Sequence, residues 1–490
     1  MGLASQTLFR ARDLSLIALS LIFLPFSVLL VGTALAFRLI SVHKSPSAPP
    51  RRDGGRQLTV LVTGIGMAKG LFLARAFHLG GCRVIGADFE KNSVPACGRF
   101  SSAISRFYKL KISTPESYAD QVAELVRNEH VDVWVSVSGV ATAMEDAVAM
   151  RAVESLEAGC RCFQFDEDTT KMLDDKSQFM RQTERLGLVS AWYCDVKDKL
   201  QVNDIVMEVK RRREEGKEVG DKYMVKNVGM DDATRGGLPI LSSSAPKQMA
   251  TVLSSLDYTG GKSWILQEFI EGGEEYCTHS VVVDGQVKAF LACPSDSVLL
   301  HYQLLDANSA LYKAMLRFTQ YYAERMFQQQ GKFTGHLSFD FLAQLKPTTT
   351  GVEKILKPIE CNPRCHTATV HFRGSEVALV NAYLSQEQST VVQSTKKTSY
   401  YWFAHDFVVL SVLPLLRTLI GQSDLDHAIN SQLEYWRHIF LWKDPTFEWW
   451  DPMPWLALYH ICWPMEMALT AWNDKSWYQI NVSTMKIFAK

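Results

Sequence analysis

Residues 357–364 read KPIECNPR, and a second acidic segment, GHLSFDFL, lies upstream at residues 335–342. Both segments have the pattern of β-strands, in which successive side chains point to opposite faces, so Glu360 and Asn362 point the same way. Pairing of the two strands would bring Asp340 to the same place. Two carboxylates and an amide oxygen form the hard-oxygen site that Mg²⁺ prefers when it also holds phosphates. The other interpretation is a strand edge that carries solvated polar side chains.

The composition is that of a globular protein with several domains. The chain has 490 residues, of which 47% are apolar and 21% charged, enough for about two to four domains with buried cores. Its formal net charge is zero, so the electrostatic footprint of a nucleic-acid-binding protein is missing and no such partner is expected. Ten cysteines stand at irregular spacings, which favours buried, inert thiols in a reducing compartment over a disulfide framework.

An uncharged apolar run at residues 14–37 predicts a transmembrane helix. About 20 helical residues cross a bilayer core. Arginines precede the run, and arginines and lysines follow it more densely, so the positive-inside bias predicts a single-pass membrane protein whose residues after 38 face the cytoplasm. A cleaved signal peptide is the alternative, because residues 34–36 read ALA. The run is longer than the usual signal-peptide core of about 7–15 residues, so an anchor in the lipid bilayer is favoured.

Residues 57–165 predict a Rossmann-like open sheet. The buried strand pattern LTVLVT at 58–63 leads into the glycine turn GIGMAKG at 64–70, and further strand patterns alternate with helices. Asp88 stands about where a ribose-binding acid would follow such a turn, which makes a nicotinamide oxidoreductase one alternative. The glycine spacing is G-x-G-x-x-x-G, however, and these glycines could serve only tight turning and close packing.

A second glycine-containing turn follows the strand pattern YMVKNV at residues 223–228. The segment GMDDATRGG at 229–237 could wrap phosphate oxygens with backbone N–H groups, and Arg235 adds positive charge. It could equally be an ordinary hairpin tip.

The order and spacing of these segments, from about residue 57 to 385, resemble the ATP-grasp superfamily in its carboxylate–amine ligase and carbamoyl-phosphate-synthetase-like branch. The resemblance implies that Lys176 and Lys226 contact ATP phosphates. It places Gly236 and Gly237 in a flexible loop that covers the phosphates. The family's loop usually carries more glycines than this one, so its closing geometry is not implied.

The resemblance also implies a nucleotide and metal site. The adenine-reading hinge would be Gln267, Glu268, Phe269 and Ile270, and the ribose hydroxyls would bind Glu275, with Glu274 as the alternative. The Mg²⁺ ligands would be Asp340, Glu360 and Asn362, with Mn²⁺ as a possible substitute. Arg364 would steady the transferred phosphoryl group, with Lys226 and Arg235 as the other catalytic cations.

The implied fold is an α/β ATP-grasp architecture with a Rossmann-like N-terminal domain, a lid subdomain, an antiparallel-sheet core and a helical, Trp-rich C-terminal extension. The expected parts are a tail (1–13), a transmembrane helix (14–37), a linker (38–56), a Rossmann-like domain (57–165), a lid (166–263), the ATP-grasp core (264–385) and the C-terminal region (386–490). The tryptophans of the last part could pack against the core or lie on the membrane, and packing is favoured.

The implied activity is an ATP-dependent ligase that converts a small-molecule carboxylate to an acyl phosphate and joins it to an amine. An amino-acid-type substrate and the biosynthesis of a specialised metabolite are expected. One alternative keeps the fold but phosphorylates an enol or bicarbonate oxygen, and another is ATP binding without turnover. His366, His371 and Arg373 could face the acceptor substrate or be satisfied polar residues of a loop. The sequence predicts neither the substrates nor the oligomeric state.

Overall fold

The computed structural model describes most of the chain, and every structural statement below concerns its described residues. These are residues 3–40, 56–111, 114–137, 139, 142–156, 159–215, 221–227, 239–259, 262–295, 301–348, 351–385, 390–473, 475, 477–481 and 486–489. Most of the predicted linker, at residues 41–55, lies outside them.

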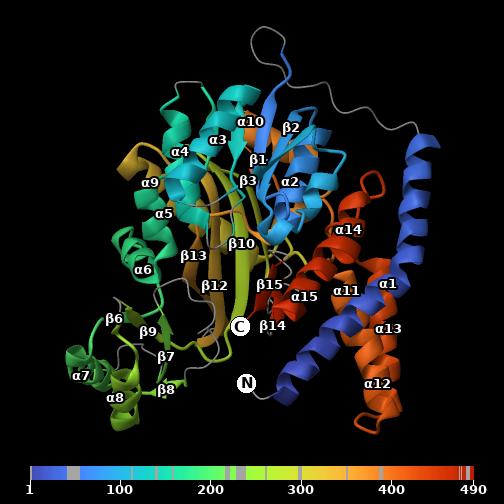
Figure 1. Ribbon diagram of the computed structural model, residues 1–490. Helices are drawn as coiled ribbons and strands as arrows, with labels where there is room; N and C mark the ends of the chain where they lie inside the picture. The colour runs from blue at the N-terminus through green and yellow to red at the C-terminus, as the bar shows by residue number, and fades with distance from the viewer. Residues whose placement is uncertain are drawn as a thin grey trace.

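A five-stranded parallel sheet forms the N-terminal domain, at the top of Figure 1. Its strand order is β3-β2-β1-β4-β5, and the central strand β1 is buried along its whole length, as apolar strands of parallel sheets are. The strands are β1 (Thr59–Thr63), β2 (Arg83–Phe89), β3 (Arg106–Leu110), β4 (Val133–Val135) and β5 (Arg161–Phe163). The helices are α2 (Ala68–Leu79), η1 (Lys91–Ser93), η2 (Cys97–Phe100), α3 (Pro115–Glu129) and α4 (Ala143–Glu154).

A small antiparallel sheet, ordered β6-β9-β7-β8, forms the lid at the lower left of Figure 1. Helices α7 and α8 cover one face of it, since their apolar residues share a core with alternate residues of β7 and β9. Its strands are β6 (Tyr193–Val196), β7 (Lys222–Asn227), β8 (Leu241–Ser242) and β9 (Trp264–Glu268). The helices of this part are α5 (Glu167–Asp174), α6 (Lys176–Arg185), η4 (Lys199–Gln201), α7 (Val202–Glu214) and α8 (Pro246–Ser255).

A second antiparallel sheet, ordered β11-β10-β12-β13, is the centre of the molecule. Its strands are β10 (Glu274–Val283), β11 (Gln286–Pro294), β12 (Gly335–Thr348) and β13 (Gly351–Asn362), and its helices are α9 (Ala310–Gln330), η8 (Thr367–Phe372) and α10 (Glu376–Leu384). Helix α9 packs on one face. It begins where the Ser309 hydroxyl accepts from the Tyr312 N–H and ends at the left-handed Gly331. The ends of β12 and β13 take up most of the polar segment 346–351.

The C-terminal region is helical and packs beside the long N-terminal helix α1 (Leu3–Ile40) on the right of Figure 1. Its elements are α11 (Phe403–Asp406), the π-helical η9 (Phe407–Val412), α12 (Leu413–Leu419), α13 (Leu425–Leu441), α14 (Met453–Ala457), the π-helical η10 (Leu458–Cys462), α15 (Trp463–Trp472) and the hairpin β14 (Trp477–Asn481) and β15 (Lys486–Ala489). Trp402, Trp455 and Trp463 are buried in the core that they share with α1. Trp436 and Trp472 are exposed, so packing accounts for only part of the tryptophan content.

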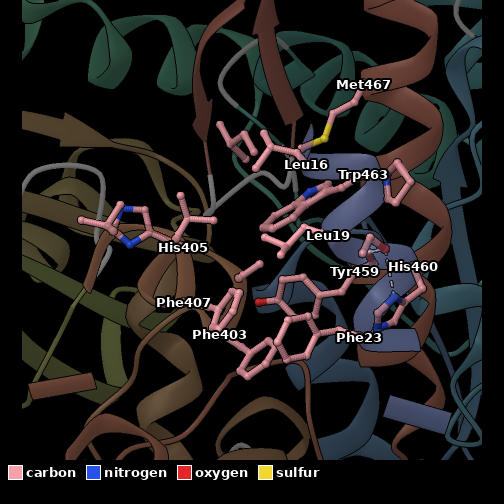
Figure 2. A pocket seen from close by; sticks show the side chains of 16 residues that line it. Leu16, Leu19, Phe23, Phe403, His405, Phe407, Tyr459, His460, Trp463 and Met467 are labelled. Carbon is pink, nitrogen blue, oxygen red and sulfur yellow. Dashed lines mark hydrogen bonds between the residues drawn. The ribbon is translucent and has the colours of Figure 1, made fainter. Parts of the chain in front are cut away.

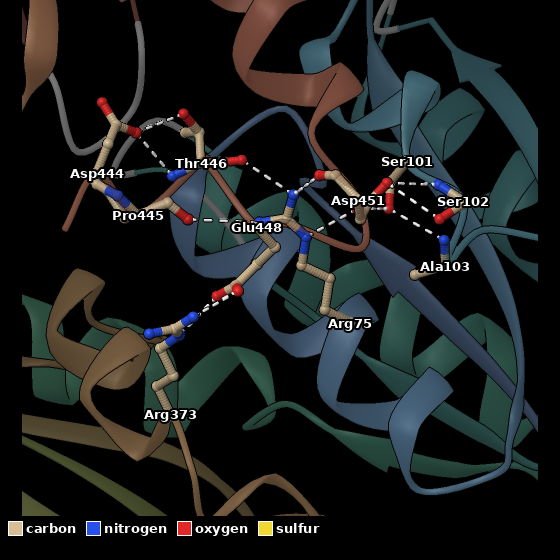
Figure 3. A network of polar contacts seen from close by, with 10 residues as sticks. All are labelled: Arg75, Ser101, Ser102, Ala103, Arg373, Asp444, Pro445, Thr446, Glu448 and Asp451. Carbon is tan, nitrogen blue, oxygen red and sulfur yellow. Dashed lines mark hydrogen bonds and ion pairs between the residues drawn. The ribbon is translucent and has the colours of Figure 1, made fainter. Parts of the chain in front are cut away.

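A buried ion pair fixes the C-terminal region to the N-terminal domain (Figure 3). Arg75 of α2 places its Nε 2.8 Å from Asp451 Oδ2, and the same guanidinium donates to the Thr446 carbonyl. Ser101 also donates its hydroxyl to Asp451. Arg75 and Asp451 are both almost completely buried, so this contact is made away from water.

The predicted fold class is confirmed: an α/β chain with a Rossmann-like parallel sheet, two antiparallel sheets and a helical C-terminal region. The ten cysteines are free, and none is fully exposed. Helix α1 is long and apolar enough to cross a membrane.

Candidate active site

Three oxygen-bearing side chains lie together on one face of the central sheet. Asp340 of β12 stands opposite Glu360 of β13 in the antiparallel register, and Ser338 stands opposite Asn362. Residues that stand opposite each other on paired strands share a face, and so do residues two apart along one strand. Asp340, Glu360 and Asn362 therefore point the same way. Asn362 donates its Nδ2–H to Asp340 Oδ2 over 3.2 Å. Two carboxylates and an amide are a donor set that fits Mg²⁺.

Arg364 is held at the edge of this oxygen cluster by two partners. Its guanidinium lies 2.7 Å from Asp174 Oδ1 and also donates to the Asn362 side-chain oxygen. The side chain is 9% exposed. A planar guanidinium anchored at two points is pre-organised, so Arg364 presents a fixed positive charge next to the three oxygen-bearing residues.

Lys176 supplies a second positive charge, and a helix break positions it. Helix α5 ends at Asp174 and α6 begins at Lys176, with Asp175 extended between them and accepting from the Gln178 N–H. The break lets both flanking residues reach β13. Lys176 Nζ lies 3.4 Å from Glu360 Oε1, while Asp174 binds Arg364.

A β-bulge adds Lys357 to the same face. The register shifts beside Asp340, so that Phe341 faces Pro358 and Leu342 faces Lys357. One extra residue in β13 turns Lys357 to the face of Glu360, although a spacing of three in a regular strand would put them on opposite faces. Its Nζ lies 2.8 Å from Glu268 Oε2.

The predicted hinge ends β9, the middle strand of the lid sheet. The Glu268 N–H donates to the Trp192 carbonyl and the Phe269 N–H to the Lys222 carbonyl, both over 2.8 Å. Gln267 and Ile270 are buried. The amides of Glu268 and Phe269 therefore bind protein carbonyls and are not open to a ligand.

Glu275 and Glu274, the two candidates for binding ribose, point to opposite faces of β10. Glu275 pairs with Leu342 in the register, which puts it on the face of Lys357 and Asp340. Glu274 accepts from the hydroxyl of Tyr276, which belongs to the core under α9. The geometry therefore favours Glu275.

The second predicted lysine, Lys226, belongs to the small antiparallel sheet. Lys226 lies in β7 on the face opposite to α7 and α8, because its neighbour Val225 belongs to the core under those helices. Arg235, Gly236 and Gly237 lie outside the described residues, and their roles stay predictions.

The three residues beyond Arg364 that were considered for the acceptor have different surroundings. Arg373 makes a two-point ion pair with Glu448, at 2.7 and 2.6 Å (Figure 3). The buried His371 ring packs against Tyr302 and Tyr400. His366 caps η8 by accepting from the Ala368 N–H. His371 and Arg373 therefore have protein partners away from β13, whereas His366 follows Arg364 by two residues.

A buried lysine and histidine group adjoins His366. Lys69, from the glycine turn of the N-terminal domain, donates to the Cys365 carbonyl over 2.6 Å, and His279 accepts from the His366 N–H. Burial, with Lys69 adding to it, lowers the pKa of His336 to about 3. Burial likewise lowers the pKa of His279 well below its usual 6.5. These two rings are therefore neutral at pH 7.

The glycine turn that suggested nicotinamide binding is covered by protein. Asp88 accepts from the Gly66 N–H over 2.5 Å, which is a group that a dinucleotide phosphate would need. A methyl group added at Gly98 would lie 2.1 Å from the Ile65 carbonyl oxygen. The segment around Gly98 therefore packs directly on the turn and takes the place of a ligand.

Sequence reasoning missed three residues of this site: Lys357, Asp174 and Lys69. The bulge that turns Lys357 inward has no sequence signature. Asp174 lies two residues before the predicted Lys176, and only the helix break shows that it reaches Arg364. Lys69 lies in a recognised glycine turn, but its partner is almost 300 residues further along the chain.

Comparisons with known proteins give fold neighbours only. No protein-family model and no curated protein matches the chain. Among solved structures it is similar to N5-carboxyaminoimidazole synthetase from Staphylococcus aureus, at 12% identity over 72% of this chain and 84% of that one, with a TM-score of 0.49. It is also similar to the biotin carboxylase domain of Hydrogenobacter thermophilus 2-oxoglutarate carboxylase, solved with ADP, magnesium and bicarbonate, at 14% identity over 70% of this chain and 73% of that one, with a TM-score of 0.47. A third similar structure is phosphoribosylamine–glycine ligase from Thermotoga maritima, at 12% identity over 70% of this chain and 81% of that one, with a TM-score of 0.45. The likeness concerns the course of the backbone and assigns no residue role.

Proposed function

We propose that the chain is an ATP-dependent ligase of the ATP-grasp type. One observation carries the proposal: Asp340, Glu360 and Asn362 share one face of two paired strands, with Lys176 and Arg364 held against them. Oxygen ligands for a hard cation, surrounded by fixed positive charges, are what the transfer of a γ-phosphoryl group requires, because that reaction depends mainly on positioning and charge neutralisation.

Each residue of the site has a proposed part in that reaction. Asp340, Glu360 and Asn362 would hold Mg²⁺, which supplies charge neutralisation on the β- and γ-phosphates when bound. Lys176 and Lys226 would contact phosphate oxygens, and Arg364 the transferred phosphoryl group. The hinge at residues 267–270 would hold adenine, and Glu275 the ribose hydroxyls.

The proposed chemistry has two steps. A carboxylate oxygen of the first substrate attacks the γ-phosphorus, and the bond to ADP breaks to leave an acyl phosphate. An amine then attacks the acyl carbon, phosphate leaves with the electron pair of the broken C–O bond, and the nitrogen loses a proton to give an amide. Lys69 and His366, which both adjoin Cys365, would contact the acceptor side of the first substrate.

We also propose that α1 holds the enzyme on a membrane with its catalytic domains in the cytoplasm. Support comes from the length and apolar composition of α1 and from the basic residues that follow it.

Release of ADP tests the proposed activity. The full-length chain in detergent is supplied with Mg-ATP and with pooled organic acids and amines, and ADP and phosphate are measured together with the products. A carboxylate labelled with ¹⁸O should pass one labelled oxygen to phosphate, because the acyl phosphate breaks at the C–O bond. An enamine product would show that the enzyme phosphorylates an enol oxygen, and carbamoyl phosphate would show that it phosphorylates bicarbonate. Either product would contradict the proposed formation of an amide.

A further inference from the structure

A group of metal-ligand side chains lies in the C-terminal region, away from the proposed nucleotide site. Ligand atoms of His301, Asp406 and His438 all lie within 4.8 Å of one another. His301 precedes α9, Asp406 ends α11 and His438 lies near the end of α13. Three separate segments therefore converge on one point.

The carboxylate of Asp406 is the centre of this group. His301 Nε2 lies 2.8 and 3.0 Å from its two oxygens, and His438 Nδ1 lies 2.5 Å from Oδ2. A further imidazole, that of His405, lies 3.0 Å from Oδ1. Asp406 is fully buried and His438 is 3% exposed, whereas His301 is 28% exposed and gives the group a side open to solvent.

Two further features distinguish this group from an ordinary hydrogen-bonded carboxylate. Glu434 Oε1 lies 3.0 Å from Nε2 of His438, the ring nitrogen that faces away from Asp406, and a carboxylate at the second ring nitrogen is common for metal-ligating histidines. The π-helical η9 begins directly after Asp406, and π-helical turns are frequent at functional sites.

We propose that His301, Asp406 and His438 bind a divalent transition-metal ion. Two imidazoles and a carboxylate are a ligand set of zinc sites that keep an open position and of non-haem iron sites. Imidazole ligands distinguish this site from the all-oxygen cluster at Asp340 and Glu360. An ion here would tie the segment before α9 to α11 and α13, and so would stabilise the C-terminal region.

Zinc uptake by the full-length chain tests this site. After dialysis against a chelator, the protein should bind about one Zn²⁺ per chain, and its melting temperature should rise on addition of Zn²⁺. His301→Ala and Asp406→Asn should each weaken Zn²⁺ affinity at least about tenfold and remove the rise. His427→Ala, an exposed histidine of the same helix α13, should change neither.

The measurements are made in a Glu360→Gln background to exclude uptake at the nucleotide site. His301 is partly exposed, so His301→Ala is expected to fold. This variant therefore tests the site even if Asp406→Asn, at a buried position, does not fold. Absence of Zn²⁺ binding, or equal binding by His301→Ala, would overturn the proposal and leave a hydrogen-bonded network around Asp406.

The helical hairpin formed by α12 and α13 carries an exposed apolar surface, an observation independent of the metal-ligand side chains. Leu419 is 81% exposed and Phe440 76% exposed, and further large apolar side chains are exposed along both helices. These include Leu415, Leu416, Leu433 and Leu441. Contiguous exposed apolar surface of this kind marks a contact with a membrane or another protein.

The neighbouring helix α1 indicates which contact this is. Val31 of α1 is buried in the same core as α14 and α15, whereas Phe26 and Leu29 are exposed. Phe23 packs its ring against Phe407, at the start of the segment that leads into α12. An apolar cavity of about 350 Å³ lies between α1 and the helical segments α11, η9, η10 and α15. Its lining includes Leu19, Phe23, Phe403 and Trp463 (Figure 2).

We infer that the α12–α13 hairpin contacts the same lipid bilayer as α1. Since α1 packs against helices of the C-terminal region, that region must lie close to any membrane that α1 enters. The exposed apolar side chains of the hairpin would then be covered by lipid, and exposed Trp436 suits the interface between lipid and water.

Fluorescent labels on full-length protein in phosphatidylcholine vesicles test this contact. An environment-sensitive dye is attached at Leu419→Cys or Phe440→Cys, and unsubstituted protein treated in the same way gives the background from the native cysteines. Both labels should shift to shorter emission wavelength and be quenched by nitroxide lipids. Leu200→Cys, at an 89% exposed leucine of the lid, should show neither effect. Labels at 419 and 440 that behave like the one at 200, or that are shielded by a second copy without quenching by lipid, would overturn the inference.

Discussion

Lys357 Nζ lies 2.8 Å from Glu268 Oε2, and this ion pair joins the lid sheet to the central sheet. Glu268 ends β9, beside the proposed adenine hinge, and Lys357 stands on the face of β13 that carries Glu360. The pair is largely shielded from water, with 8% and 14% of the two side chains exposed. It therefore sets the distance between the sheet proposed to read adenine and the sheet proposed to hold the metal.

Removing either partner of this pair should weaken ATP binding. Lys357→Met leaves the Glu268 carboxylate buried beside the hinge, and Glu268→Gln removes its charge. In a double-mutant cycle of ATP dissociation constants measured by calorimetry, we expect a coupling energy of about 1–3 kcal/mol. Lys262→Met, which breaks an exposed pair with Asp257, should leave ATP affinity unchanged. Additive effects of the two site substitutions would show that the pair has no part in nucleotide binding.

Regular alternation explains which parts of the site the sequence could predict. Asp340, Glu360 and Asn362 lie in strands with clear apolar and polar alternation, so their shared face followed from spacing alone once the two strands paired. The parallel sheet also followed from local pattern, because its strands are short apolar runs separated by helices.

The remainder of the site depends on irregularities and long-range contacts. Lys357 reaches the site through a bulge, which reverses the faces that spacing predicts. Arg373 was a candidate for binding substrate, but its partner Glu448 lies 75 residues further along the chain, in a segment without a recognised motif. No local pattern could indicate either contact.

Arg364→Lys should lower the rate of catalysis more than it raises the KM for ATP. Arg364 contacts Asp174 and Asn362 together, and a lysine cannot bind both with one planar group. Loss of a pre-organised donor at the transferred phosphoryl group should reduce kcat by about 10²–10³-fold. Steady-state kinetics with Arg373→Lys as the matched control, at an arginine paired with Glu448, should show kcat close to that of the unsubstituted enzyme. Equal losses in the two variants would contradict the role of Arg364.

Buried neutral histidines should make the protein sensitive to acid. The pKa of His336 is lowered to about 3 in the folded protein, mainly by burial, against about 6.5 when unfolded. The unfolded chain therefore binds more protons between these values, so stability is complete above about pH 6.5 and falls as the pH drops toward 3. His336→Gln should reduce the loss of folding free energy on acidification by up to about 1.4 kcal/mol per pH unit. Melting temperatures at pH 7.5 and 5.5 would measure this, with exposed His427→Ala retaining the original acid sensitivity. An unchanged pH dependence in His336→Gln would contradict a neutral His336.

Asp451→Ala should loosen the C-terminal region from the N-terminal domain. It leaves the Arg75 guanidinium buried without its carboxylate, at a cost of about 3–5 kcal/mol. Limited proteolysis should then cut between the core and the C-terminal helices much faster than in the unsubstituted protein. Asp257→Ala, which breaks an exposed pair, should leave the protease resistance unchanged. Equal protease resistance of Asp451→Ala and the unsubstituted chain would show that the buried pair does not hold the two parts together.

Phosphoryl transfer from ATP is measured as ADP release by full-length protein with Mg²⁺ and pooled organic acids and amines. We predict that ADP release requires Mg²⁺ and falls at least about 100-fold in Glu360→Gln, while circular dichroism and melting temperature stay close to those of the unsubstituted chain. Glu324→Gln, at an exposed glutamate of α9, should release ADP at the unsubstituted rate. Undiminished ADP release by Glu360→Gln, or binding of a reduced nicotinamide cofactor without any binding of ATP, would contradict a Mg-ATP site on the paired strands of Asp340 and Glu360.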